Sequence, residues 1–169
     1  MIFVFDSTPL IYLAKAGILP KLAGLRMKLV IPKAVYEEVV VDGRRRGKQD
    51  ALVVEKLVSD EAFAVADARG KELVKRLLSN PGLSKADAET LALARELKAV
   101  AVVDESLCRS VAGFEGIGFH GSVFVLFLLQ KKKIISKADL KAAINSMVGS
   151  GWRCSTELYA AILTEIEKV

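Results

Sequence analysis

Short apolar runs that end in an acidic residue are the feature that most constrains how this chain folds. Ile2–Phe5 is followed directly by Asp6, and the run 100–103 is followed by Asp104. Each run has the length and the β-rich composition of a buried strand, and helical spacing of apolar side chains lies next to it. Alternating strands and helices predict a mostly parallel sheet covered by helices. Ligands of such sheets bind beyond the carboxyl ends of the strands.

The same alternation continues along the rest of the chain. Further strands are predicted at 28–31, 61–66 and 117–119, and helices at 10–14, 18–22, 33–39, 50–57, 70–78, 84–98, 122–130, from 136 onward and at 155–167. Ser84 has the character of an N-cap. The segment 42–48 has two glycines, four cations and no apolar periodicity, so we expect an exposed loop there.

Composition supports one folded domain over residues 1–169, with a core of about 1–130 and a C-terminal helical extension of about 131–169. Hydrophobic residues make up 52% of the chain and charged residues 27%, which excludes disorder as the main state. The longest uncharged apolar run, 121–129, is much shorter than the ~20 residues of a membrane-spanning helix. No signal-like segment precedes Asp6, so we expect a cytoplasmic protein without membrane contact.

Acidic residues that interrupt apolar patterns are the candidate functional residues. Asp6 and Asp104 each follow a predicted strand. Both also precede a helix, so a helix N-cap, a position that Asp favours, is the alternative for each. On a helical wheel, Asp87 lies inside the apolar stripe of its helix, whereas Glu89 and Glu96 lie on the opposite, solvated face. Asp87 is therefore expected to point towards the core.

A fourth acid, Glu38, lies beside the apolar stripe of Val35 and Val39 by the same wheel arithmetic. Four carboxylates at one end of a parallel sheet repel one another unless protons or cations neutralise them. Oxygen ligands without His or Cys suit Mg²⁺ or Mn²⁺ better than Zn²⁺. We therefore expect a divalent cation at this edge, and metal-assisted phosphodiester chemistry.

Ordered motifs along nearly the whole chain resemble the PIN-domain family, in particular its archaeal and bacterial VapC-like branch with a C-terminal helical extension. The motifs are, in order, DSTPLIYLAKAG, IPKAVYEEVV, LSKADAETLALA, VVDESLCRSVA, GIGFHGSVFVLFLLQKKKIISKADL and SGWRCSTELYAAIL. The resemblance implies a three-layer α/β fold and a Mg²⁺- or Mn²⁺-dependent ribonuclease. Its acidic quartet falls on Asp6, Glu38, Asp87 and Asp104, and Glu105 is an additional ligand or a residue that positions water.

The chain departs from the family pattern near two of these acids. Val103 stands where PIN nucleases often have Ser or Thr, and Glu105 stands where they often have a second Asp. Ala86 and Asp87 stand where relatives with this long tail often have Gly and Glu. A catalytically inactive PIN-fold protein that binds RNA or acts as a scaffold is therefore the alternative function.

Basic and polar residues are candidates for contacts to RNA. Those in the segment 42–48 are Arg44, Arg45, Arg46 and Lys48. They would neutralise backbone phosphates, and a solvated basic loop is the alternative. Ser7 is a candidate donor to a metal ligand or a phosphate, with a helix cap as the alternative. Arg109 is a candidate phosphate contact, with an exposed or ion-paired side chain as the alternative.

The resemblance also implies partners. These are an RNA substrate, a second copy in a homodimer and, for the toxin of a toxin–antitoxin pair, a small antitoxin protein. A haloacid-dehalogenase-like phosphatase also begins with a strand and an Asp, but the second acid of that family, two residues later, is Thr8 here. A phosphatase of that class is therefore disfavoured.

Overall fold

A parallel sheet forms the centre of the computed structural model, which describes residues 1–168. Among these residues the sheet has five strands in the order β3-β2-β1-β4-β5. The strands are β1 (Ile2–Phe5), β2 (Lys28–Pro32), β3 (Ala64–Ala66), β4 (Val100–Val102) and β5 (Phe119–His120). Each neighbouring pair runs in parallel. The predicted α/β class with a parallel sheet is confirmed.

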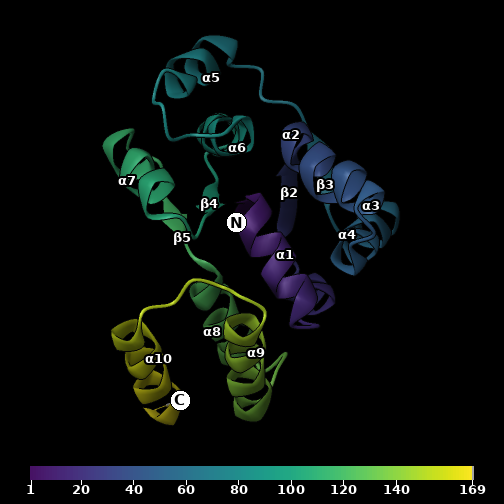
Figure 1. Cartoon of the computed structure of the whole chain (residues 1–169), viewed down its shortest axis with the longest axis vertical. Helices are drawn as coiled ribbons and strands as arrows, with labels where there is room; N and C mark the ends of the chain where they lie inside the picture. Colours follow the sequence, from purple (N-terminus) through teal and green to yellow (C-terminus); the bar gives the residue numbers. More distant parts are fainter. Residues whose placement is uncertain (169) are drawn as a thin grey trace.

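Helices connect the strands and surround the sheet (Figure 1). They are α1 (Ser7–Lys15), the 3-10 helix η1 (Leu19–Leu25), α2 (Lys33–Tyr36), the π-helix η2 (Glu37–Asp42), α3 (Gly43–Arg45), α4 (Gln49–Ser59), α5 (Lys71–Leu78), α6 (Lys85–Glu96), α7 (Ser106–Phe114), α8 (Ser122–Lys131), α9 (Lys137–Gly149) and α10 (Thr156–Lys168). The last three helices lie together at one end of the molecule, and α5 lies at the other (Figure 1). In the described part of the chain, no helix combines the length and apolarity required to span a membrane.

The central strand β1 contributes side chains to both faces of the sheet. Phe3 and Phe5 belong to one hydrophobic cluster, and Val4, which points the other way, belongs to a second. The first cluster extends into the C-terminal helices as far as Ile166, and the second includes Leu91 of α6. The sheet is therefore the middle layer of three, and β1 has the uninterrupted apolar sequence that burial on both faces requires.

The segment 42–48, expected to be an exposed loop, is exposed at 44–48 but is helical as far as Arg45, so the loop part of that expectation is wrong. Helices α2, η2 and α3 follow one another without a break from Lys33 to Arg45. Gly43 is buried, and a Cβ atom there would lie 2.9 Å from the Cβ of Ala51 in α4. This glycine therefore permits close packing of two helices, and it does not mark a turn. The chain turns only at Gly47, which has a φ of +68°.

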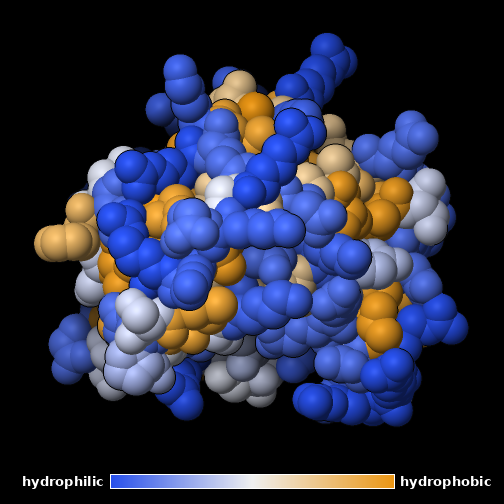
Figure 2. Space-filling model, turned by 90° about the horizontal axis from the view of Figure 1, so that it is seen from above, coloured by the Kyte–Doolittle hydropathy of each residue, from blue (hydrophilic) through white to orange (hydrophobic). Residues whose placement is uncertain are grey.

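Other boundaries differ little from the expected ones. Ser84 caps α6, and Ser136 precedes and caps α9. Strand β5 pairs at Phe119 and His120, slightly later than expected. The exterior is mostly hydrophilic, with separate apolar patches between the polar side chains on the face drawn in Figure 2. The parallel register of β1 and β4 brings the residues that follow them to the same edge of the sheet.

Candidate functional site

Asp6 lies at the carboxyl end of the central strand. Its side chain is 3% exposed, and its Oδ1 atom has no hydrogen-bond partner among the described residues. Asp6 is the N-cap of α1 by position but its side chain makes no capping bond, so capping does not explain this acid. Burial, followed by the charges of Asp87, Glu38 and Glu105, raises the pKa of Asp6 from 3.8 to about 8, against a lowering by the Ser7 backbone. This carboxyl group therefore requires a proton or a cation.

Glu38 reaches the same edge from the helix that follows β2. The Ser7 hydroxyl donates a hydrogen bond to Glu38 Oε2 over 3.0 Å. Ser7 therefore donates to a candidate metal ligand, which is the first of the two roles considered for it. Its side chain does not cap α1. Glu38 lies in the π-helix η2. π-Helical turns are rare and are often found at functional sites.

Asp87 is buried in the first turn of α6, as the helical wheel predicts. Its backbone N–H donates to Ser84 Oγ over 3.1 Å, and the Ser84 N–H donates to Asp87 Oδ2 over 2.8 Å. This capping box fixes the direction of the carboxylate. Burial, followed by the charges of Asp87 and Asp6, raises the pKa of the Cys108 thiol in α7. We infer from these charge effects that the thiol lies close to both acids. Cys108 is therefore a neutral thiol next to the acids.

Glu89 does not lie on a solvated face, so that expectation is wrong. Its Oε2 atom accepts a hydrogen bond from the backbone N–H of Ala34 over 3.0 Å. Ala34 is in the first turn of α2, whose N–H groups have no partners within the helix. Glu89 of α6 thus holds the start of the helix that leads to Glu38. A helical wheel shows the face of a residue on its own helix and cannot show that another helix covers that face.

Asp104 follows β4, and its contacts lead to the C-terminal extension. Its Oδ1 accepts the Ser122 backbone N–H over 2.8 Å, and its Oδ2 accepts the Ser122 hydroxyl over 2.6 Å. Oδ2 also accepts the indole N–H of Trp152 over 3.0 Å. Three donors therefore occupy most of the acceptor positions of this carboxylate. The N-cap position of α7 belongs to Glu105, so Asp104 does not cap that helix.

Ser122 and Trp152 were not recognised as candidate residues from the sequence. Trp152 is the single tryptophan of the chain and is buried, and it lies between α9 and α10. A buried tryptophan usually requires a hydrogen-bond acceptor for its N–H group, so a single tryptophan in the sequence could have indicated a buried polar contact. The identity of that acceptor, 48 residues earlier in the chain, could not be read from sequence spacing.

Glu105 follows Asp104 and is exposed. Its charge is one of those that raise the pKa of Asp6, so it lies near the buried acid. Among residues 1–168 its side chain makes no ion pair. The charges of Asp87, Glu38 and Glu105 therefore all act on Asp6. In this part of the chain, however, no three His, Cys, Asp or Glu side chains converge on a ready-made metal site.

The candidate RNA-binding residues have varied environments. Arg44 pairs with Glu55 at 2.6 Å, and Arg45 pairs with Asp42 at 3.2 Å. Arg46 and Lys48 are exposed, and neither forms an ion pair within the described residues. The guanidinium of Arg109 lies 5.4 Å from the centre of the Phe119 ring, a cation–π contact. Two of the four cations in the segment 42–48 are thus already engaged by acids.

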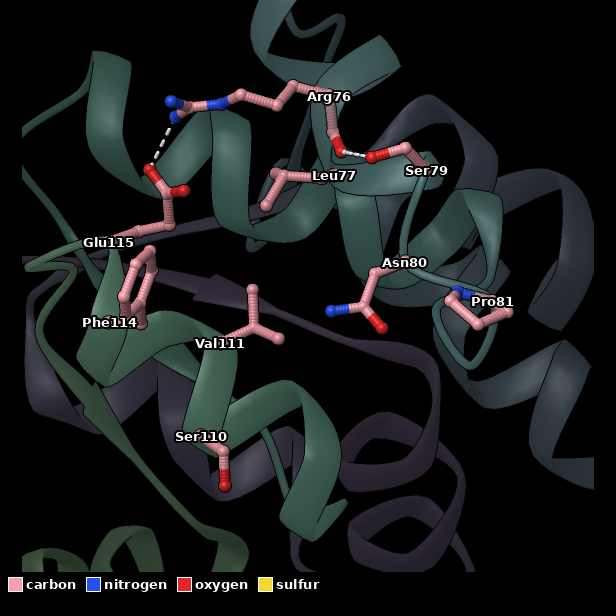
Figure 3. A pocket seen from close by; sticks show the side chains of 9 residues that line it. All are labelled: Arg76, Leu77, Ser79, Asn80, Pro81, Ser110, Val111, Phe114 and Glu115. Carbon is pink, nitrogen blue, oxygen red and sulfur yellow. Dashed lines mark hydrogen bonds and ion pairs between the residues drawn. The ribbon is translucent and has the colours of Figure 1, made fainter.

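A cleft of about 920 Å³ lies between the sheet edge and the C-terminal extension, and Asp104 and Glu105 are the candidate acids that line it. Its lining comes from α1 (Thr8 and Tyr12), from 104–107 and from 151–155. A separate hollow of about 490 Å³ between α5 and α7 is lined partly by Arg76, Phe114 and Glu115 (Figure 3). None of the predicted site residues lines that second hollow. The cleft beside the acids is therefore the relevant cavity.

Comparisons with known proteins agree with the fold. The family model described as a PIN domain matches residues 2–168. Among solved structures, the chain is similar to PAE2754 from Pyrobaculum aerophilum, with a TM-score of 0.56 and 20% sequence identity. That match covers 78% of this chain and 99% of PAE2754, and at this identity it shows a shared fold. No curated protein matches the chain significantly.

Proposed function

The chain belongs to the PIN-domain family, and from this premise we propose that it is a divalent-metal-dependent endoribonuclease that hydrolyses RNA phosphodiester bonds. The observation that carries the proposal is the unpartnered Oδ1 of Asp6, buried among negative charges. A buried carboxylate oxygen without a hydrogen-bond partner is costly. A divalent cation removes this cost and the mutual repulsion of the acids together.

The donor set fits Mg²⁺ or Mn²⁺. Asp6, Asp87 and Glu38 would supply carboxylate oxygens, and Glu105 a fourth. Glu105 is the better fourth ligand because three donors already occupy Asp104. One or two divalent ions bound here supply a water of lowered pKa and stabilise charge on the phosphate.

The surrounding residues position these acids for that role. Ser7 holds Glu38, and Ser84 directs one oxygen of Asp87 away, which leaves the other oxygen free for a cation. Glu89 fixes the start of α2 and so the helix that carries Glu38. The buried environment of Asp6 keeps competing water from its oxygens. The chain's own contribution is thus a set of preoriented oxygen ligands.

A PIN-fold protein that binds RNA without cleaving it is the second candidate function. It is favoured by the spread of the acids, since no three of them within residues 1–168 converge. A toxin function would add a small antitoxin partner to the nuclease proposal, and a homodimer is its expected assembly. Co-purification with the product of an adjacent gene tests for the antitoxin partner, and light scattering tests for the homodimer.

The deciding experiment measures cleavage of a structured RNA with Mn²⁺ or Mg²⁺ and with EDTA. Wild type is compared with Asp6→Asn and with Arg69→Ala, a control at an exposed position. We expect cleavage by wild type and by the control, and none by Asp6→Asn or in EDTA. Equal cleavage by wild type and Asp6→Asn would remove the assigned site. Metal-independent RNA binding without cleavage by wild type would support the second candidate.

A further inference from the structure

The C-terminal extension is tied to the sheet edge at two points. Asp104 accepts a hydrogen bond from Trp152 of the extension, in addition to two from Ser122, the first residue of α8. The Tyr12 hydroxyl of α1 donates to the Gly151 carbonyl over 3.0 Å. The segment 151–155 is therefore held against α1 and against the end of β4. These contacts, and not only the packing of the C-terminal helices, determine the position of the segment relative to the acids.

Space around Asp104 is kept open for this connection. A Cβ atom at Gly121 would lie 3.0 Å from Asp104 Oδ1, which is tighter than most contacts of real Cβ atoms. Gly121 therefore lets the start of α8 approach closely enough for the Ser122 N–H to bond the carboxylate. Trp152 is only 7% exposed. Its indole N–H donates to Oδ2 of the same carboxylate.

This connection produces the cleft described above. Its lining brings Glu105, whose charge acts on Asp6, together with Arg153 and Cys154 of the segment 151–155. Arg153 is exposed and, within residues 1–168, forms no ion pair. An unpaired arginine that shares a cleft with Asp104 and Glu105 is placed to attract an anion that the carboxylates alone would repel.

We propose that single-stranded RNA lies in this cleft and that Arg153, held in place by the Asp104–Trp152 hydrogen bond, contacts a phosphate next to the scissile one. This inference rests on the proposed ribonuclease function and identifies the wall of the site that receives the substrate backbone. The arginine fork matches a phosphate in geometry as well as in charge. Asp104 acts here as a positioning residue through Trp152.

Binding in EDTA separates this inference from the cleavage reaction. The probe is a short fluorescein-labelled single-stranded RNA, followed by anisotropy at several salt concentrations. Arg153→Ala is expected to weaken binding several-fold and to reduce the slope of log K against log salt by about 0.7, the value for one lost contact to a single strand. Arg153→Lys keeps the charge and should keep the slope. Arg69 is exposed and lies two residues before α5, the helix at the end of the molecule away from α8–α10 (Figure 1). The control Arg69→Ala should therefore bind like wild type.

Native Cys154 reports occupancy of the cleft independently. Cys108 is 1% exposed, whereas Cys154 is partly exposed and lines the cleft. Saturating RNA is expected to slow alkylation of Cys154 by iodoacetamide, followed by mass spectrometry. Trp152→Phe retains an aromatic ring but loses the N–H donor, so Cys154 should react faster and RNA should bind more weakly.

Any of three results would overturn the inference. The first is an unchanged affinity and salt slope for Arg153→Ala, and the second is undiminished Cys154 alkylation in saturating RNA. The third is a wild-type protein without measurable RNA binding. Loss of metal-dependent cleavage alone contradicts the nuclease proposal instead, because the binding and alkylation measurements contain no metal. Equal binding of single-stranded DNA would reject RNA as the preferred class.

Discussion

The Ser7 hydroxyl donates a hydrogen bond to Glu38 Oε2 over 3.0 Å, joining the first residue of α1 to a glutamate 31 positions later. Ser7 is itself 5% exposed, so the bond is anchored in the protein interior. Glu38 is exposed, and its side chain has no other hydrogen bond among the described residues. The orientation of this candidate ligand therefore depends on one buried serine.

Ser7→Ala is expected to lower cleavage about fivefold, because one hydrogen bond worth about 1 kcal/mol no longer orients Glu38. Ser7→Thr keeps the hydroxyl and serves as the conservative comparison. Initial rates at saturating Mn²⁺ provide the measurement. A Ser7→Ala rate equal to wild type would mean that Glu38 is positioned without this bond.

Asp6→Asn is expected to stabilise the metal-free protein at neutral pH while abolishing cleavage. Between pH values near 3.8 and about 8, folded Asp6 retains a proton that the unfolded chain has lost. Wild-type stability in EDTA should therefore fall as the pH rises through this window, and the fall should be smaller in Asp6→Asn. Urea denaturation at several pH values measures this. Identical pH profiles for the two proteins would contradict the burial of an unsatisfied carboxyl group.

Asp104→Asn and Glu105→Gln should affect different properties, the first the stability of the fold and the second the affinity for Mn²⁺. The amide NH₂ group introduced at position 104 would face the donor groups of Ser122 and Trp152, so we expect Asp104→Asn to lower the free energy of unfolding by about 1–3 kcal/mol. Glu105→Gln removes an exposed charge near Asp6, so it should weaken Mn²⁺ binding with little change in stability. Thermal unfolding and titration calorimetry with Mn²⁺ distinguish the two. If Asp104→Asn weakened Mn²⁺ binding more than Glu105→Gln, Asp104 would be the ligand and Glu105 would not.

Gly43→Ala is expected to destabilise the fold by about 1–3 kcal/mol, because its Cβ would lie 2.9 Å from the Cβ of Ala51. Gly149, at the end of α9, is the matched control, since a Cβ atom added there would have no neighbour within 4 Å. Gly149→Ala should be neutral or stabilising, because alanine favours the helix. Equal midpoints in chemical denaturation for the two variants would exclude the proposed contact between α3 and α4.

Local patterns were sufficient to predict the central strand, the cap of α6 and the burial of Asp87. Each depends on residues that are close in sequence: an apolar run, Ser84 three residues before its partner, and a stripe along one helix. In these cases the periodicity of a strand or helix carries the information directly. The parallel sheet then follows from the alternation of elements.

Contacts between distant elements were not predictable in this way. Asp104 has partners 18 and 48 residues away, and Glu89 reaches a helix 55 residues earlier. Gly43 looked like part of a loop because a glycine that admits a neighbouring helix has the same sequence signature as one that permits a turn. These features depend on how helices pack, and one sequence contains no direct record of that packing.

The π-helix η2 joins two α-helical parts of one continuous helix. Glu38 lies near the start of this segment, and Arg44 and Arg45 lie beyond it in α3. A π-helical turn closes i→i+5 hydrogen bonds where an α-helix closes i→i+4, so it holds one more residue in the same turn. Removing one residue within 39–42 would therefore restore α-helical geometry and leave Glu38 and the two arginines on their present faces of the helix. The length of this segment can thus change by one residue without disturbing the acidic edge.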